Sequence, residues 1–228
     1  MKKVCIFGDS ISKGVILDTI DNRYHMTKNS FVNYFSDYKP CIHIKNYAMF
    51  GCTVIKGRSL IDRHAIDVNN CDVLLLEYGG NDCDFDWSAI ADAPGEKHLP
   101  KTPLDVFVDS YHDIIKRLSS LGKKIILMNL PPIDENNYFS WFSRGLDQDN
   151  IIKWLGGDTH YIYEYQASYS DKVCEIAAEY ELQIIDIREE FLRQPNYSDF
   201  LCRDGIHPND KGHALIVQKI KNIIPQLC

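Results

Sequence analysis

Residues 3–10 of the chain read KVCIFGDS. A short apolar run that stops at a glycine is typical of a strand buried on both faces of a parallel sheet. Four more runs of this kind follow, so the predicted strands are residues 3–7, 42–47, 72–78, 124–130 and 183–187. Helical patterns lie between them, and the predicted helices are residues 31–38, 54–66, 104–121, 165–180 and 213–224. This alternation predicts an α/β sandwich around a five-stranded parallel sheet.

Length and composition predict a single domain over residues 1–228. The chain has 45% apolar and 25% charged residues, without a linker or an internal repeat. A chain of this length buries about 70% of its unfolded surface. The segment 133–163 is rich in aromatic residues and too long for an ordinary connection. We expect it to form a partly helical insertion over one side of the sheet, either as the wall or lid of a substrate pocket or as a separate apolar cluster.

Charge and hydropathy argue against nucleic-acid and membrane partners. The formal net charge is −7 and the basic residues do not cluster, which disfavours binding to a phosphate backbone or an anionic membrane surface. The sequence has no run of 18 apolar residues, and the run at residues 4–7 is too short for a signal peptide. The eight cysteines are scattered, without a C-x-x-C pair. We therefore expect a soluble, cytoplasmic protein without a membrane span, whose thiols are reduced and mostly buried; the oligomeric state is not predicted.

Ser10 directly follows the first predicted strand, at the edge of the sheet where ligands bind in folds of this class. The alternative is that Gly8-Asp9-Ser10 is a plain turn in which Asp9 or Ser10 caps a helix. A serine becomes a nucleophile when a base lies within reach and an acceptor orients that base. Ser10 is therefore a candidate nucleophile if the chain also supplies such a pair.

The loop at residues 204–209, DGIHPN, supplies a histidine and a carboxylate three residues apart. On a turn, this spacing lets Asp204 accept a hydrogen bond from Nδ1 of His207 and leaves Nε2 facing a serine. The glycine and the proline help such a turn to keep one shape. A solvated loop histidine is the alternative reading, and His213 in the last predicted helix is the rival base.

Acyl transfer also needs donors that stabilise the developing oxyanion. Gly51 and Asn81 each follow a predicted strand at the same edge of the sheet. The backbone N–H of a glycine can approach a ligand closely, and an asparagine amide can donate from its NH₂ group. Each residue alone could equally belong to a simple turn.

Taken together, four blocks resemble the SGNH hydrolases, also called the GDSL lipase/esterase family, from about residue 2 to 225. The blocks are Gly8-Asp9-Ser10, Gly51, Gly80-Asn81-Asp82 and Asp204-Gly205-Ile206-His207-Pro208. The resemblance implies a flavodoxin-like, three-layer α/β/α sandwich. It also implies that Ser10 is the nucleophile, His207 the base and Asp204 its orienting carboxylate. The oxyanion hole would consist of the Ser10 and Gly51 N–H groups and the Asn81 side chain.

Two departures from the family pattern stand out. The first block reads GDSIS rather than GDSL, which leaves the serine in place. The second block, residues 46–51, lacks the extra glycine that many members carry before the key one.

The remaining polar clusters predict no metal and no cofactor. Asp82, Asp84 and Asp86 alternate as in a calcium loop, but position six is Trp87 rather than glycine and position twelve is not glutamate. We expect Asp82 to order the loop behind Asn81 instead. No His/Cys set has zinc spacing, and the glycines match neither G-x-G-x-x-G nor a P-loop.

These observations predict a serine esterase that acts on a small-molecule ester through an acyl-enzyme. The expected substrate carries a short acyl group, such as an O-acetyl ester of a carbohydrate, and we expect Asp9 and Trp87 at the substrate. Lysophospholipase, thioesterase and acyltransferase activity at the same site are alternatives. A non-catalytic binding protein on the same fold is a further one, although a degenerate member would be expected to lose at least one of the catalytic residues.

Overall fold

A computed structural model of the chain describes residues 1–18, 20–37 and 42–221. Its main sheet has five strands, which in spatial order are β4 (Ile42–Asn46), β1 (Lys2–Gly8), β5 (Val73–Glu77), β6 (Lys124–Met128) and β7 (Gln183–Ile185). Every neighbouring pair is parallel. This order is that of flavodoxin-like sheets, so the predicted five-stranded parallel sheet is confirmed.

Strand β1 shows why the apolar runs become central strands. Its residues from Val4 onward are buried, and they alternate between the two faces of the sheet. Cys5 and Phe7 belong to one apolar core, whereas Val4 and Ile6 belong to another on the opposite face. A strand with a core on each side has no solvated face, which explains a continuous apolar run in place of a polar–apolar alternation.

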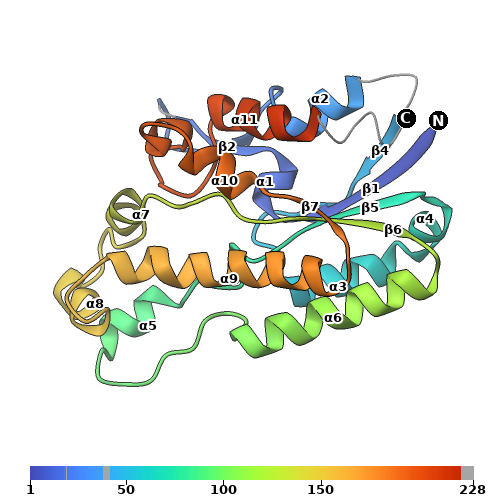
Figure 1. Cartoon of the computed structure of the whole chain (residues 1–228). Coiled ribbons are helices and arrows are strands. Elements are labelled where there is room, and N and C mark those ends of the chain that lie inside the picture. Colours follow the sequence, from blue (N-terminus) through green and yellow to red (C-terminus); the bar gives the residue numbers. More distant parts are fainter. Residues whose placement is uncertain (19, 38–41, 222–228) are drawn as a thin grey trace.

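Helices cover both faces of the sheet (Figure 1). One layer contains α1 (Ser10–Lys13), α2 (Phe31–Asp37), α10 (Ile187–Leu192) and α11 (Asp210–Lys221). The other contains α3 (Val54–Arg63), α4 (Ala65–Asn70), α6 (Leu104–Ser120) and α9 (His160–Glu179). Helix α6 buries Phe107, Tyr111, Ile114 and Leu118 at helical spacing and is followed by Gly122 at φ +67°. The three-layer arrangement matches the predicted sandwich.

Three predicted helices have different limits in the structure. The helix expected at 54–66 is divided at His64, whose ring stacks on Tyr47 at 4.0 Å and holds the chain at a bend between α3 and α4. The helix expected from residue 165 begins at His160, because Ile162 packs into an apolar cluster beyond the sheet. The last helix begins at Asp210, and the end predicted at residue 224 lies outside the described residues.

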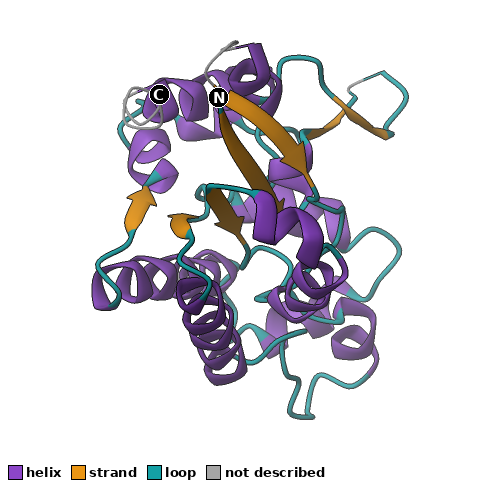
Figure 2. Cartoon of the chain, turned by 90° about the vertical axis from the view of Figure 1, so that its right-hand side faces the viewer, coloured by secondary structure: helices purple, strands orange, loops and turns teal. Residues whose placement is uncertain are grey.

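A small antiparallel hairpin, which the sequence analysis does not predict, stands apart from the main sheet (Figure 2). It consists of β2 (Val15–Leu17) and β3 (Tyr24–Met26). The backbone N–H of Leu17 donates to Cys202 Sγ at 3.4 Å. Just after the hairpin, Thr27 Oγ1 donates to Asp210 Oδ1 at 2.6 Å. The hairpin is thus held against the loop that carries His207.

Segment 133–163 contains two short helices, α7 (Glu135–Phe142) and α8 (Gln148–Trp154), and the first turn of α9. They lie with α5 (Trp87–Asp92) beyond the carboxyl ends of the strands (Figure 1). Together they form a third apolar cluster, separate from the two cores of the sheet. Residues of this cluster also line a cavity at the site described below. The segment therefore combines the two roles considered for it, an apolar cluster and a pocket wall.

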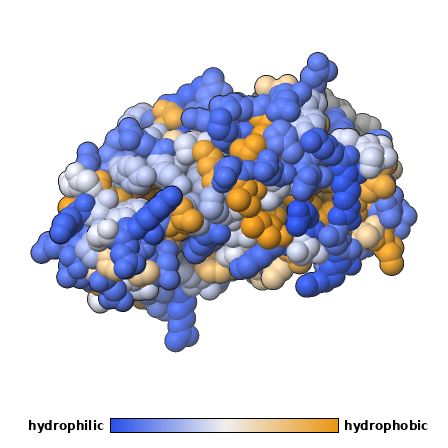
Figure 3. All heavy atoms as spheres, turned by 90° about the horizontal axis from the view of Figure 1, so that it is seen from below, coloured by the Kyte–Doolittle hydropathy of each residue, from blue (hydrophilic) through white to orange (hydrophobic). Residues whose placement is uncertain are grey.

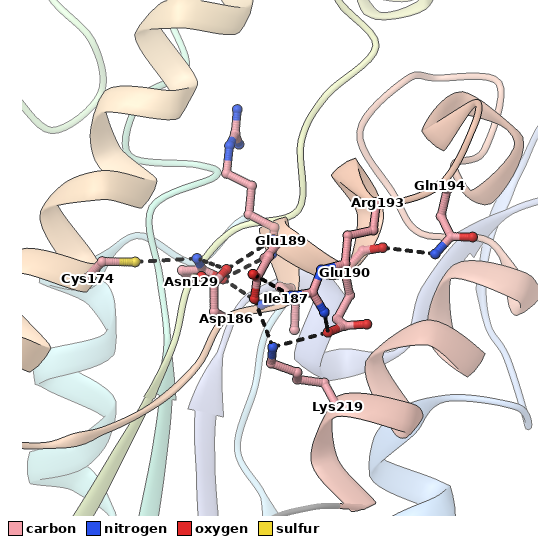
Figure 4. A network of polar contacts seen from close by, with 10 residues as sticks. Asn129, Cys174, Asp186, Ile187, Glu189, Glu190, Arg193, Gln194 and Lys219 are labelled. Atoms are coloured by element: carbon pink, nitrogen blue, oxygen red, sulfur yellow. Dashed lines mark hydrogen bonds and ion pairs between the residues drawn. The ribbon is translucent and has the colours of Figure 1, made fainter.

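Polar contacts join α10, which precedes the His207 loop in the chain, to its neighbours (Figure 4). Asn129, just after β6, accepts hydrogen bonds from the Ile187 and Arg188 N–H groups at the start of α10. Lys219 on α11 lies 3.2 Å from Glu189 and 3.1 Å from Glu190. These contacts join the sheet, α10 and α11, the elements that flank the loop.

The outer face seen from below is mostly hydrophilic, with apolar side chains in scattered areas (Figure 3). No helix in the described ranges is both long and apolar enough to cross a membrane. The six cysteines within these ranges are free thiols, and five of them are buried. Cys41 and Cys228 lie outside the described residues.

Candidate active site

Ser10 lies where β1 turns into α1. The side chain of Asp9 caps this helix by accepting from the Ile11 N–H at 2.9 Å. Gly8 is required at the end of the strand, because a Cβ there would lie 2.8 Å from Glu77 Oε2 and from Ser12 Oγ. Asp9 therefore caps a helix, as the alternative reading expects, and Ser10 lines the cavity at the carboxyl edge of the sheet.

The structure brings Ser10, His207 and Asp204 into one hydrogen-bonded chain. His207 Nε2 lies 2.9 Å from Ser10 Oγ, and His207 Nδ1 lies 2.7 Å from Asp204 Oδ2. The other carboxylate oxygen of Asp204 accepts from the N–H groups of Ile206 and His207 at 3.1 and 3.2 Å. Gly205 between them has φ +76° and touches the backbone of α7, so neither the fold of the loop nor its packing tolerates a side chain there.

Electrostatics favour a charged Asp204. Its burial would by itself raise the pKa of the carboxyl, but the hydrogen bonds and charge of His207 outweigh that effect and lower the pKa. The carboxylate can therefore hold the imidazole in the tautomer that carries its proton on Nδ1. Nε2 is then free to accept the proton of Ser10.

Gly51 and Asn81 both line the cavity beside Ser10. Gly51 has φ +68° in the loop between β4 and α3, and its N–H has no acceptor within the described part of the chain. One N–H of the Asn81 amide donates to Asp9 Oδ2 at 3.0 Å, which leaves the second N–H of that group available for a ligand. The Ser10 N–H, in the first turn of α1, has no intrahelical partner. The residues that carry the three predicted donors thus line the same cavity.

Two buried carboxyl groups support this arrangement from behind. Asp9 and Glu77 are 1% and 0% exposed. Burial, followed by the charge of Asp9, raises the pKa of Glu77 well above its usual range, and burial also raises the pKa of Asp9. Because the two buried carboxyl groups are adjacent, ionisation of one disfavours ionisation of the other. Glu77 Oε2 accepts from the N–H groups of Asp9 and Ser12, each at 3.3 Å, so it fixes the turn that carries the serine.

Asp82 links the Asn81 loop to the Gly51 loop. Its carboxylate accepts from the Val54 N–H at the start of α3, at 3.0 and 3.2 Å. Burial raises the pKa of Asp82 to about 7. The residue therefore orders the loop behind Asn81, as the sequence analysis expects, and it also holds the start of the helix that follows Gly51.

A cavity of about 290 Å³ extends from Ser10 toward α5, α7 and α9. Its wall includes Asp9, Trp87, Phe85, Tyr138, Tyr165 and Lys101. Trp87 stacks on Phe142 at 4.1 Å and is 8% exposed, so it serves both the apolar cluster and the cavity wall. Asp9 reaches this wall with its carboxylate already bound by Ile11 and Asn81.

Asp84 and Asp86 have partners of their own, different from those of Asp82. Asp84 accepts from Trp87 Nε1 at 2.9 Å and from Tyr138 Oη at 2.6 Å, and it pairs with Lys101 at 2.7 Å. Asp86 caps α5. In the ranges that the structure describes, no group of three or more acidic, histidine or cysteine side chains could hold a metal ion.

A model of the GDSL-like lipase/acylhydrolase family matches residues 6–215, which include Ser10, Gly51, Asn81 and His207. The chain belongs to this family. Among curated GDSL proteins, it is 24% identical over 161 residues to the GDSL esterase/lipase CPRD49 of Arabidopsis thaliana and 23% identical over 156 residues to WDL1 of Oryza sativa subsp. japonica. Each match covers 68% of this chain and 54% of the relative, so the chain spans about half the length of these relatives.

Solved structures of GDSL proteins share the fold. A lipolytic G-D-S-L family member from Veillonella parvula gives a TM-score of 0.67 at 16% identity, with 99% of this chain and all of that chain covered. Axe2, an acetylxylan esterase from Geobacillus stearothermophilus, gives 0.67 at 20% identity, with 97% and 94% covered. These neighbours agree with the flavodoxin-like sheet of this GDSL protein.

The rival base His213 is not among the residues that line the cavity of this GDSL protein. Its side chain is fully buried on α11, near Phe31, and burial lowers its pKa to about 4. The sequence analysis assigns no role to three other groups at the site, which are Glu77, Tyr24 and Phe50. Glu77 lies within an apolar strand, where its charge is the only sequence signal, and Tyr24 lies on the unpredicted hairpin with its ring 5.1 Å from that of His207.

Proposed function

We propose that the protein is a serine esterase that hydrolyses short acyl esters, in particular O-acetyl esters of carbohydrates. Ser10 attacks the ester carbonyl while His207 Nε2 takes its proton. The tetrahedral oxyanion is stabilised by the N–H groups of Ser10 and Gly51 and by the amide of Asn81. His207 then returns the proton to the leaving alcohol, and water hydrolyses the acyl-enzyme by the same steps.

One observation carries this proposal: the hydrogen-bonded chain from Ser10 Oγ through His207 to Asp204, with distances of 2.9 and 2.7 Å. This chain lies at a cavity lined by the oxyanion donors. A binding protein on this fold would have no need to keep a nucleophile, a base and an orienting carboxylate in register. Membership of the GDSL-like lipase/acylhydrolase family supports the same activity.

The acetyl-carbohydrate specificity extends the proposal from the reaction to the substrate. Two of the similar structures are described as acetylxylan esterases, one from Geobacillus stearothermophilus and one named AlAXEase. Their identity to this chain is 20% and 19%, so they support the fold, and the substrate is our extension. The cavity of about 290 Å³ exceeds the size of an acetyl group, which keeps longer acyl esters and thioesters as the competing substrates.

The test is ester hydrolysis by the wild type and by Ser10→Ala, with Ser59→Ala as the control because Ser59 is exposed on α3. The substrates are p-nitrophenyl acetate, butyrate and octanoate and an acetylated xylooligosaccharide, with EDTA present. We expect Ser10→Ala to be inactive, Ser59→Ala to match the wild type, and acetate to be the best acyl group. Equal activity of Ser10→Ala and wild type would refute the mechanism. A preference for octanoate would refute the short-acyl specificity alone.

A further inference from the structure

The position of His207 determines where the alcohol part of an ester must lie. Its Nε2 atom, 2.9 Å from Ser10 Oγ, has to protonate the leaving oxygen. The alcohol therefore lies beside the imidazole. The groups that border His207 in the cavity are therefore the ones that can contact the alcohol and select it.

Two aromatic rings from separate elements border His207. Tyr24, on β3, has its ring centroid 5.1 Å from that of the imidazole. Phe50, in the loop after β4, lies 6.0 Å from it, and the planes of these two rings differ by 12°. The Tyr24 and Phe50 rings are 5.3 Å apart, and both line the cavity that contains Ser10. We call this pair of rings the Tyr24–Phe50 platform.

Exposure distinguishes the platform from the rest of the cavity. Phe50 is 55% exposed and Tyr24 is 37% exposed, whereas Phe85 and Trp87 on the inner wall are 7% and 8% exposed. Large apolar rings that stay open to solvent beside a catalytic histidine suggest a contact made only when ligand is bound. The aromatic surface continues to Trp141, whose ring lies 6.2 Å from that of Tyr24.

We propose that the Tyr24–Phe50 platform is the subsite for the alcohol part of the substrate and that it binds a sugar ring. This inference rests on the proposed esterase activity. A pyranose ring has apolar C–H faces and hydroxyl groups around its edge, so it can cover an aromatic face while its hydroxyls stay in water. A long alkyl chain would gain less from such a site, because the half-exposed rings leave much of the chain in water.

The test compares two acetate esters that differ only in the alcohol: methyl 2-O-acetyl-β-D-xylopyranoside and ethyl acetate. The variants Phe50→Leu and Tyr24→Leu keep apolar bulk but remove the flat ring, and Met49→Ala is the control because Met49 is an exposed neighbour at 48%. We expect each ring variant to lower kcat/KM for the sugar ester about fivefold to tenfold, the size of one lost aromatic contact. For ethyl acetate, whose small alcohol covers little of either ring, we expect a smaller loss of kcat/KM than for the sugar ester, and we expect Met49→Ala to match the wild type with both esters.

A binding measurement separates this inference from the esterase proposal. Saturation-transfer NMR with methyl β-D-xylopyranoside, which has no ester, reports on the platform without catalysis. We expect a signal with the wild type and with Ser10→Ala, and a weaker one with Phe50→Leu. In the NMR measurement, the sugar subsite would be overturned by equal signals with wild type and Phe50→Leu, or by no signal with either protein. In the kinetics, it would be overturned by equal losses of kcat/KM with both acetate esters. Sugar binding without hydrolysis of any ester would leave the subsite in place and refute the esterase.

Discussion

Replacing Asp204 with asparagine tests how the carboxylate controls the proton on His207. Oδ1 of Asp204 accepts from the N–H groups of Ile206 and His207 at 3.1 and 3.2 Å. In Asp204→Asn, the amide oxygen has to keep this position, because the NH₂ group cannot accept these bonds. The NH₂ group then faces Nδ1 of His207 and donates to it. The imidazole is forced to carry its proton on Nε2, where it cannot accept the proton of Ser10.

The size of the effect follows from this geometry. Every catalytic cycle would begin from the wrong tautomer, while the oxyanion donors and the cavity stay unchanged. A tautomer error of this kind costs about 1,000-fold to 10,000-fold in kcat, or about 4–5.5 kcal/mol. The backbone bonds that hold the loop are kept, so we expect the free energy of unfolding to change much less than the activation barrier.

The assay is kcat for p-nitrophenyl acetate at pH 7, combined with ¹⁵N NMR of the imidazole nitrogens of His207. We expect kcat to fall by about three to four orders of magnitude and the proton to move from Nδ1 to Nε2. Urea denaturation monitors folding as the control. A loss below about tenfold with the proton on Nε2 would refute the tautomer argument, and an unchanged tautomer would refute the hydrogen-bond assignment.

Three further predictions concern the oxyanion hole, the buried acid behind it and the cavity wall. Asn81→Ala lowers kcat for p-nitrophenyl acetate by about 100-fold or more, since one oxyanion donor is lost; a loss below about threefold in steady-state kinetics would exclude that role. Asp82→Asn removes a carboxyl whose pKa is raised to about 7 by burial. Because the pKa of Asp82 is higher in the folded than in the unfolded protein, the free energy of unfolding falls as the pH rises toward the folded-state pKa. Urea denaturation should therefore show the wild type losing about 3 kcal/mol more than Asp82→Asn between pH 5 and pH 8. An equal pH dependence of both proteins would count against a buried, protonated Asp82. Trp87→Ala removes a buried ring and is expected to lower the free energy of unfolding by about 3–5 kcal/mol and to raise KM for several esters, with Trp87→Phe closer to wild type; an unchanged KM would limit Trp87 to the apolar cluster.

Local patterns account for much of the fold. Strands buried on both faces have short apolar runs as their sequence pattern. The positions of the five strands along the chain can therefore be predicted from runs such as Val4 to Phe7. The limits of helices are harder to predict, because they depend on distant contacts. The stack of His64 on Tyr47, which divides α3 from α4, joins residues that no local pattern relates.

The candidate catalytic residues are predictable for the same local reason. Ser10 follows a strand through a glycine, and Asp204 and His207 lie three residues apart on a turn whose glycine has φ +76°. Their spacing along the chain already determines how Asp204 can orient the imidazole. The tight turns after the strands, at Gly51 and Asn81, likewise mark the edge of the sheet where ligands bind.

Only the tertiary structure decides what supports and surrounds these residues. Glu77 reads as an isolated charge in an apolar strand, and its contact with the Asp9 N–H depends on the pairing of β1 with β5. Tyr24 and Phe50 meet over His207 because a hairpin and a distant loop converge there. The sequence by itself thus determines the five strands of the main sheet, the longer helices and the local motif of the candidate site, since short-range sterics and hydrophobic periodicity encode them. The buried carboxyl pair and the aromatic platform are set by contacts between residues far apart in the chain, which no short-range pattern encodes.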